Sequence, residues 1–293
     1  MDNSDRSIKQ DWYLPNEYTP TCEFYLKIAH RSQASTSSIV SMDSQTSDTD
    51  QYRETLCQSK TREGSIQVQQ LIESSPPEEV DRIIESICPI FRELSEDNFG
   101  NYAVQSLIKV LSDVQRLHLL SSIAPLISCL SYHPKGTHVI QALATLVCLE
   151  AEDKVFYEQL RGKVCDFARH PHGIYVLLKL LKVPMSRHLY VREMIGQVYQ
   201  LATHKVSICV VKVVVRDPQI VNEMMGSVIS LMQNPYGNYA LQIAIDMWRE
   251  EISFPVKCAI KGKVVQLCCQ KYASNVIEKC LKVDEIRGAW LMR

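Results

Sequence analysis

Residues 98–111 of the chain read NFGNYAVQSLIKVL, and this stretch recurs in altered form along the sequence. The related strings are REGSIQVQ, PKGTHVIQ, PHGIYVLL, HKVSICVV, PYGNYALQ and KYASNVIE. Aligning them gives one reference position per unit, 31 to 37 residues apart: Gly64, Gly100, Gly136, Gly173, Val206, Gly237 and Ala273. A regular period of this size indicates a repeat architecture, in which each unit buries its apolar face against its neighbours.

Two further features keep a fixed distance from the reference position. A helix breaker precedes it by 10 or 11 residues, at Pro89, Pro125, Gly162, Gly196, Gly226 and Gly262. The residue three before it is mostly suited to N-capping: Thr61, Asp97, His133, His170, Thr203, Asn234 and Gln270. These breaks predict three helices per unit, the second of about 13 residues. In the second unit they predict helices over 98–111 and 113–128.

Composition agrees with a helical chain. Only 10 of the 293 residues are glycine, which argues against β-rich folds and phosphate-cradling loops. No paired carboxylates, nucleophile elbow or metal-ligand spacing stands out, so we expect no enzyme, no catalytic residue, no metal and no cofactor. No apolar run is long enough to cross a membrane. The 11 cysteines form no CxxC pair and indicate buried free thiols in a reducing compartment, so we expect a cytoplasmic protein.

The N-terminal part differs from the repeats. Residues 31–51 are rich in Ser, Thr and Asp and hold few large apolar side chains. We therefore expect residues 1–58 to be disordered or weakly ordered, with short helical pieces near Tyr25–Ile28, and residues 59–293 to form the repeat domain. Residues 1–153 carry 12 basic and 22 acidic side chains, and residues 154–293 carry 20 and 11. The basic C-terminal half would attract a polyanion.

The candidate functional residues follow each reference position. Its first and fifth successors lie one turn apart on one helix face. These pairs are Ser65/Gln69, Asn101/Gln105, Thr137/Gln141, Ile174/Leu178, Ser207/Val211, Asn238/Gln242 and Ser274/Glu278. The second successors are Ile66, Tyr102, His138, Tyr175, Ile208, Tyr239 and Asn275. Five of the seven pairs can hydrogen bond, and none uses Lys. Such groups can read base edges, with a flat side chain between them to stack on a base.

The strings GNYAVQ, GNYALQ and ASNVIEKC resemble the Pumilio (PUF) family of RNA-binding repeat proteins over about residues 58–293. The resemblance implies a right-handed α-solenoid of about seven three-helix repeats that forms a curved arc and reads one base per repeat. It implies uracil at Asn101/Gln105 and Asn238/Gln242, guanine at Ser274/Glu278 with Asn275 beside the base, and, more weakly, adenine at Ser65/Gln69 and Thr137/Gln141. Tyr102 and Tyr239 would stack on bases, and His138 could do so.

Family RNA runs antiparallel to the repeats, so the implied site is 5′-G-U-x-x-A-U-A, related to a UGU-containing element. The implied partners are single-stranded RNA of mRNA 3′ untranslated regions and proteins of mRNA repression or decay, without a membrane. The pairs Ile174/Leu178 and Ser207/Val211 depart from the family pattern. Only 20 residues follow Ala273, so the family's eighth repeat has no counterpart, and a fragment, a divergent member and a partner-docking edge all remain open.

Two function classes therefore stand side by side. The first is sequence-preferring RNA binding for post-transcriptional regulation of translation or mRNA stability. The second is an α-solenoid scaffold that binds protein and has lost RNA readout. A nucleolar, structure-tolerant branch of such proteins ranks last, because the chain has no Lys/Arg cluster.

Overall fold

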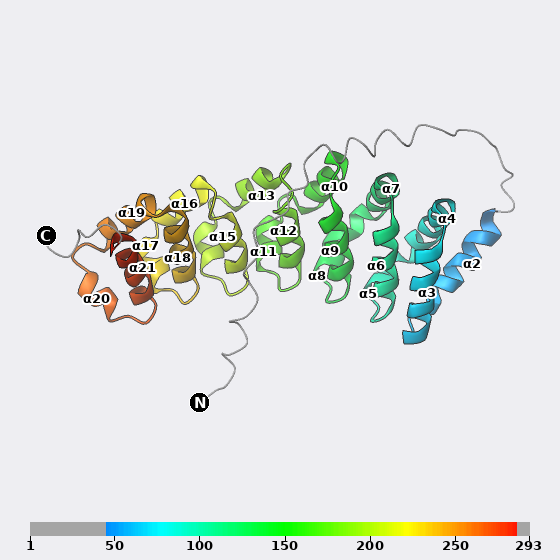
Figure 1. The fold of residues 1–293 in the computed structure, drawn as a ribbon, viewed down its shortest axis with the longest axis horizontal. Coiled ribbons are helices and arrows are strands. Elements are labelled where there is room, and N and C mark those ends of the chain that lie inside the picture. The colour runs from blue at the N-terminus through cyan, green and yellow to red at the C-terminus, as the bar shows by residue number, and fades with distance from the viewer. Residues whose placement is uncertain (1–44, 286–293) are drawn as a thin grey trace, which may run out of the picture. The chain divides into compact units, whose positions relative to one another are not determined.

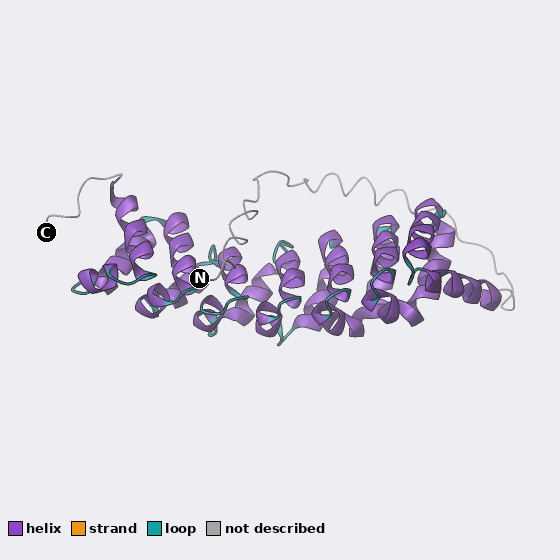
Figure 2. Ribbon diagram, turned by 90° about the horizontal axis from the view of Figure 1, so that it is seen from below, coloured by secondary structure: helices purple, strands orange, loops and turns teal. Residues whose placement is uncertain are grey.

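The computed structural model of the protein describes residues 45–285. This part of the chain is helical and contains no strand, and all of it falls in one compact unit (Figure 2). The predicted all-α fold is confirmed. The segment 1–44, including the helical piece expected near Tyr25–Ile28, lies outside the described residues.

The second to sixth repeats each contain three helices, and the first and seventh repeats share part of this pattern. Short first helices are α5 (Phe91–Glu96), α8 (Ile127–Tyr132), α11 (Val164–Arg169), α14 (Val198–Ala202), α17 (Val228–Gln233) and α20 (Val264–Cys268). Middle helices are α3 (Arg62–Ser74), α6 (Gly100–Val110), α9 (Gly136–Leu146), α12 (Gly173–Leu180), α15 (Ile208–Val214), α18 (Gly237–Trp248) and α21 (Ala273–Glu285). Third helices are α4 (Pro77–Ile87), α7 (Asp113–Ile123), α10 (Glu150–Leu160), α13 (Arg187–Met194), α16 (Pro218–Met225) and α19 (Glu250–Ile260).

The middle helices stack side by side in chain order, each in contact with the next (Figure 1). The third helices run along one side of this row in the same view. Apolar residues at helical spacing, such as Val104, Leu107 and Ile108 of α6, are fully buried between neighbouring helices. Each such side chain stabilises the fold by about 1.5–3 kcal/mol through burial. The repeats therefore share one continuous core that no single repeat could form alone.

The predicted caps set where the middle helices begin. Asp97 Oδ1 accepts hydrogen bonds from the backbone N–H groups of Phe99 and Gly100, both at 2.8 Å. Thr61 accepts from Gly64, and Asn234 from Tyr236 and Gly237. Histidine does the same through Nδ1 at His133 and His170. These bonds satisfy backbone donors that a helix start leaves unpaired.

The reference glycine is required by close packing. A Cβ atom added at Gly100 would lie 2.9 Å from the carbonyl oxygen of Leu94, six residues earlier. The same contact would occur at Gly136 with Leu130 and at Gly237 with Leu231. The glycine period seen in the sequence thus records a turn in which the chain passes close to the preceding short helix.

One predicted boundary was wrong. The helix expected over 113–128 ends at Ile123, because Pro125 has no N–H to continue it and lies in a short 3-10 turn, Ala124–Leu126. A further helix precedes residue 59, where the repeat domain is expected to begin. Helix α2 (Gln45–Gln58) packs on α3 and α4 and buries Leu56. The polar composition of residues 45–51 concealed this helix.

The fifth repeat is shifted by one residue from the predicted alignment. Its cap is His204, not Thr203, and the His204 Nδ1 atom accepts from Val206 N and Ser207 N at 3.3 and 3.4 Å. Ser207 therefore takes the place of the reference glycine. Its hydroxyl donates to the Leu201 carbonyl, again six residues earlier, at 2.7 Å. The serine side chain fits there because its hydroxyl hydrogen bonds the carbonyl oxygen of Leu201. In the glycine-containing repeats, an added Cβ would only press against the corresponding carbonyl oxygen.

Candidate nucleic-acid interface

The first, second and fifth residues after each reference position, here called the reading positions, differ consistently in exposure. First-position side chains are buried in repeats one to four and six, and Asn101 and Asn238 are at most 2% exposed. Second-position side chains are exposed: Ile66, Tyr102, His138, Tyr175, Tyr239 and Asn275. Fifth-position Gln69, Gln105, Gln141 and Gln242 are half-buried. The first, second, third and sixth repeats thus offer one exposed side chain between one buried and one half-buried polar group.

The Asn–Gln pairs form the same hydrogen-bond network in two repeats. Asn101 Nδ2 donates to the carbonyls of Asp97 and Asn98 at 2.8 and 3.0 Å, and Gln105 Nε2 donates to Asn101 Oδ1 at 2.9 Å. In the sixth repeat, Asn238 Nδ2 donates to the carbonyls of Asn234 and Pro235, and Gln242 Nε2 donates to Asn238 Oδ1 at 3.0 Å. The two backbone carbonyls require the nitrogen of the asparagine amide to face them, and this fixes both amides.

This network leaves defined groups free on the glutamine. Because one Nε2 proton is engaged by the asparagine, each glutamine retains one N–H donor and its Oε1 acceptor side by side. Uracil presents an N3–H donor beside a carbonyl acceptor on its Watson–Crick edge, which is complementary to that arrangement. Tyr102 and Tyr239 are 54% and 50% exposed, so their rings can stack on a base at the same repeat.

The hydroxyl-containing pairs also orient their glutamines. Ser65 Oγ donates to the Phe99 carbonyl at 2.9 Å, and Gln69 Nε2 donates to Ser65 Oγ at 3.0 Å. Thr137 Oγ1 donates to the His172 carbonyl at 3.2 Å, and Gln141 Nε2 donates to Thr137 Oγ1 at 3.1 Å. Both hydroxyls bond the residue just before the next repeat's reference glycine. The two hydroxyl side chains therefore link neighbouring repeats and also orient the glutamine of their own repeat.

The seventh repeat presents a carboxylate instead of an amide. Glu278 is exposed and pairs with Lys282 one turn along α21 at 2.6 Å. Hydrogen bonding to Lys282 and its charge lower the pKa of Glu278, which favours the ionised carboxylate. A carboxylate accepts two hydrogen bonds and donates none. Guanine offers adjacent N1–H and N2–H donors, so the predicted pairing is chemically consistent, with Lys282 as a competitor. Ser274 and Asn275 lie beside it on the same helix.

The fourth and fifth repeats lack a paired polar contact. Ile174 is buried and Leu178 half-buried, but Tyr175 is 44% exposed at the second position. In the fifth repeat the predicted pair is out of register, since Ser207 takes the place of the reference glycine and Val211 is 1% exposed. The corrected register places Ile208, Cys209 and Lys212 at the reading positions. The spacing from His204 to Ser207, equal to that from His170 to Gly173, could have shown this in the sequence.

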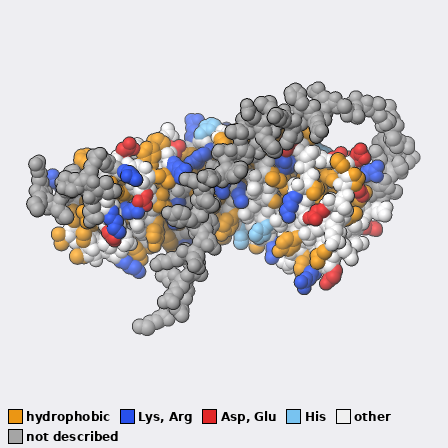
Figure 3. Space-filling view, viewed as in Figure 1, with side chains coloured by type: hydrophobic (Ala, Val, Ile, Leu, Met, Phe, Trp, Pro, Cys, Tyr) orange, Lys and Arg blue, Asp and Glu red, His pale blue; other side chains and the backbone are white. Residues whose placement is uncertain are grey.

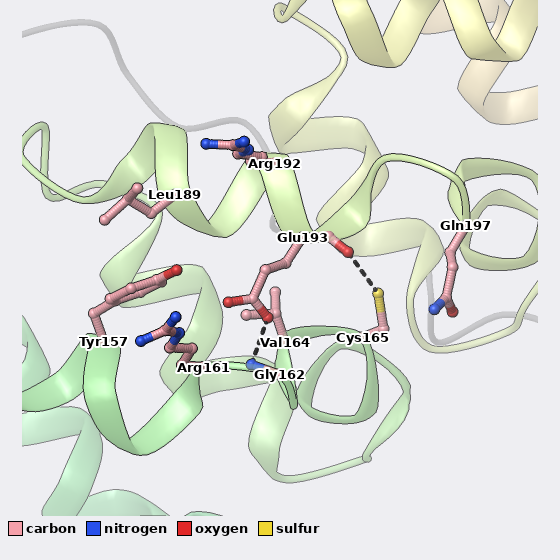
Figure 4. Close-up of a pocket in the computed structure, with 9 residues that line it drawn as sticks. All are labelled: Tyr157, Arg161, Gly162, Val164, Cys165, Leu189, Arg192, Glu193 and Gln197. Carbon is pink, nitrogen blue, oxygen red and sulfur yellow. Dashed lines mark hydrogen bonds between the residues drawn. The ribbon is translucent and has the colours of Figure 1, made fainter.

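A separate cavity of about 660 Å³ lies between α10, α11 and α13, away from the reading positions (Figure 4). Its polar contacts belong to a joint between repeats. Glu193 Oε2 accepts from the backbone N–H of Gly162 at 2.8 Å, and the Cys165 thiol points to the Glu193 carbonyl at 3.5 Å. Burial raises the pKa of the Cys165 thiol, which disfavours a nucleophilic thiolate. The arrangement provides no catalytic constellation.

Other chemistry is sparse in residues 45–285. No cluster of His, Cys, Asp and Glu there could hold a metal ion, and none of its helices has the length and apolarity to cross a bilayer. None of the ten cysteines of this part forms a disulfide, and only Cys165 and Cys280 among them are buried, so the expectation of buried thiols was too broad. On the face shown in Figure 3, basic, acidic and apolar side chains are interspersed.

Comparison with known proteins agrees with this geometry. A model of the Pumilio-family RNA-binding repeat matches residues 68–88, 91–124, 163–183, 227–253 and 263–285. Pumilio homolog 12 of Arabidopsis thaliana is 26% identical over 246 residues, which are 80% of this chain and 41% of that protein. A Pumilio domain-containing protein of Schizosaccharomyces pombe, C6G9.14, is 26% identical over 230 residues, or 76% and 34% of the two chains. The chain therefore spans well under half the length of these relatives.

Solved structures share the fold. The Puf4 RNA-binding domain bound to the HO endonuclease RNA 3′ UTR recognition sequence matches with a TM-score of 0.72 at 24% identity, covering 78% of this chain and 74% of that one. PUF-8 in complex with PBE-RNA matches with a TM-score of 0.70 at 21% identity, covering 91% and 76%.

The three-helix repeats stack in a row, and each has three reading positions. This arrangement defines a helical-repeat protein of the nucleic-acid-binding class. The chain belongs to the Pumilio family of RNA-binding repeat proteins, as a distant relative of plant and yeast members. That family is not one of enzymes. Residues 184–226, which include the shifted fifth repeat, fall outside the segments that the family model matches.

Proposed function

We propose that the chain binds single-stranded RNA in a sequence-preferring manner, one base per repeat, and thereby regulates the translation or stability of mRNA in the cytoplasm. The observation that carries this proposal is the identical amide network at Asn101–Gln105 and Asn238–Gln242. Solvated helix faces have no reason to hold two glutamines in one orientation. Two repeats with the same free donor and acceptor beside an exposed tyrosine are what recognition of one kind of base requires.

The proposed order of bases follows the repeats from the C-terminus. Glu278 accepts from guanine, Gln242 pairs with uracil, Gln141 reads adenine, Gln105 uracil and Gln69 adenine, which gives 5′-G-U-x-x-A-U-A. The Puf4 structure holds the HO endonuclease RNA 3′ UTR recognition sequence and the yeast Puf5p structure holds AAT2 RNA, which supports an mRNA 3′ UTR as the ligand class. A UGU-containing element and proteins of mRNA repression or decay are proposed partners of the full protein.

A specificity swap tests the base assignment. In the variant S274N/E278Q, the seventh repeat acquires the pair found at Asn238 and Gln242. We expect its preferred base to change from G to U at the matching position of a GUxxAUA RNA, while preferences at the other positions stay the same. The measurement is fluorescence anisotropy with four RNAs that differ only at that base. Retention of a guanine preference would refute base readout by this repeat.

A protein-binding scaffold is the second candidate function. It is favoured by the apolar reading positions Ile174, Leu178 and Ile208, which offer a base no hydrogen bond. The salt dependence of RNA binding separates the two candidates, because each phosphate contact adds about 0.7 to the slope of log affinity against log salt for a single strand. Steep weakening between 50 and 200 mM salt supports RNA binding. No binding of GUxxAUA RNA at low salt supports the scaffold.

A further inference from the structure

The fifth repeat presents different side chains from those its sequence alignment suggests. Backbone hydrogen bonds give its register independently of the His204 cap. Ile208 N donates to the His204 carbonyl and Cys209 N to the Val206 carbonyl, both at 3.2 Å. In the sixth repeat, Asn238 N donates to Asn234 and Tyr239 N to Tyr236 in the same pattern. Ile208 thus corresponds to Asn238, and Cys209 corresponds to Tyr239.

Exposure follows the same register. Ile208 is 5% exposed, as buried as the other first-position residues, whereas Cys209 and Lys212 are exposed. The fifth position, which holds glutamine in four repeats, holds Lys212 here. An ammonium group donates up to three hydrogen bonds and accepts none. It can therefore contact only acceptors, such as a base carbonyl oxygen or a phosphate oxygen.

The Lys212 ammonium is directed toward the next repeat. Its Nζ atom lies 5.3 Å from the centroid of the Tyr239 ring, within the range of a cation–π interaction. Tyr239 is the exposed second-position ring of the sixth repeat, flanked by the Asn238–Gln242 network. Lys212 therefore lies in the row of reading side chains, between the position of one nucleotide and that of the next.

We propose that Lys212 is an RNA contact of the fifth repeat, which donates from its ammonium to an oxygen acceptor of the nucleotide at the fifth-repeat position, next to the Tyr239 ring. The acceptor is either a carbonyl oxygen of the base or a phosphate oxygen. This inference rests on the proposed function, since it assumes that RNA lies along the reading positions. The fifth repeat, which has no paired polar contact for a base, thus binds RNA through the charge of Lys212.

Charge-removing and charge-keeping variants test the contact. We expect K212Q to bind GUxxAUA RNA about fivefold or more weakly at 150 mM salt, and K212R to stay near the wild type. The matched control is K154Q, which removes an exposed lysine from third helix α10, outside the reading positions. If K212Q and K154Q bind RNA with the wild-type affinity, salt slope and base preference, the proposal is overturned.

The same titrations distinguish the two acceptors. Loss of a phosphate contact weakens RNA binding by the same factor whichever base stands at the fifth-repeat position. It also lowers the salt slope by about 0.7. Loss of a base carbonyl contact reduces the preference among the four bases at that position. Either result supports the contact.

A second pair of variants tests the register itself. In I208N/K212Q the new asparagine faces the carbonyls of His204 and Lys205, which correspond to those of Asn234 and Pro235 that Asn238 uses. We expect this variant to gain a uracil preference at the fifth-repeat position. The matched variant S207N/V211Q places the same residues at buried positions and should lose folding stability instead, measured by circular dichroism. A uracil preference from S207N/V211Q would refute the register.

Failure of this inference is distinct from failure of the proposed function. If the wild-type chain binds no RNA at low salt, the proposed function fails and the Lys212 contact fails with it. If it binds GUxxAUA RNA and the S274N/E278Q swap succeeds while the Lys212 variants behave as the wild type, only the Lys212 contact is wrong.

Discussion

The guanidinium Nε of Arg116 lies 2.6 Å from Glu152 Oε1, and both side chains are buried between third helices α7 and α10. Glu152 is 0% exposed and also accepts from the backbone N–H groups of Cys148 and Leu149 through Oε2. Arg116 is further held by Asp113 at 2.9 Å. One charged pair thus joins the second repeat to the third on the side away from the reading helices.

Removing Glu152 should strongly destabilise the protein. In the variant E152A, the buried Arg116 charge keeps only Asp113 as an acidic partner. The backbone N–H groups of Cys148 and Leu149 also lose their acceptor. We expect the free energy of unfolding to fall by about 3–5 kcal/mol in urea denaturation. The control D113A removes the more exposed partner of the same arginine and should cost about 1 kcal/mol or less. An E152A midpoint equal to that of D113A would contradict this account.

Exposed rings at the second position should contribute directly to RNA affinity. Replacing Tyr239 with alanine removes a stacking surface, and we expect GUxxAUA RNA to bind with about 1–3 kcal/mol less free energy. Tyr199 offers a matched control, because it is 39% exposed but lies on first helix α14. Titrations of Y239A and Y199A should differ. Equal affinities would show that RNA does not stack on the middle helices.

The close turn at the reference glycine predicts a backbone effect. An added Cβ at Gly136 would lie 2.9 Å from the Leu130 carbonyl oxygen, so G136A should cost about 1–3 kcal/mol of unfolding free energy. At Gly226 the nearest atom to an added Cβ is 3.3 Å away and φ is −63°, so G226A should change stability little. The comparison uses urea midpoints for both variants. A G136A protein as stable as G226A would argue against the steric requirement.

Acid should weaken the fourth repeat through His170. Its Nδ1 accepts from His172 N and Gly173 N at 3.2 Å, so the cap needs a neutral imidazole. Burial, and then the charge of His172, lower the pKa of His170 below its usual 6.5. Because the folded pKa is the lower one, the unfolded state takes up the proton first. This contribution to stability is complete above about pH 6.5 and is lost as pH falls toward the folded pKa.

Asparagine at the same position provides the test. Asn234 caps the sixth repeat through Oδ1 at 2.8 and 2.9 Å and does not titrate. We expect H170N to lose less stability than the wild type between pH 7.5 and pH 5, measured by urea midpoints at each pH. Identical losses in the two proteins would mean that protonation of His170 is not coupled to folding.

Much of the fold could be predicted from local signals. The glycine spacing, the capping residues and the apolar period each depend on neighbours within a few positions in the chain, so the sequence displays them openly. The Asn–Gln pairs are visible for the same reason, since one helical turn separates their members. The one-residue shift at Ser207 was missed because neither Val206 nor Ser207 is a glycine, the residue that marks most other units. Helix α2 was missed because, within its residues 50–58, only Leu56 is strongly buried.

The sequence by itself determined the repeat period, the helical class, the caps and the family to which the chain belongs. Only the tertiary structure decided how deeply each reading side chain is buried, how the glutamine amides are oriented, and that the Lys212 ammonium approaches the Tyr239 ring. Those facts depend on backbone carbonyls supplied by other turns and on rings supplied by the next repeat. The sequence records that such groups exist, but packing decides which of them meet.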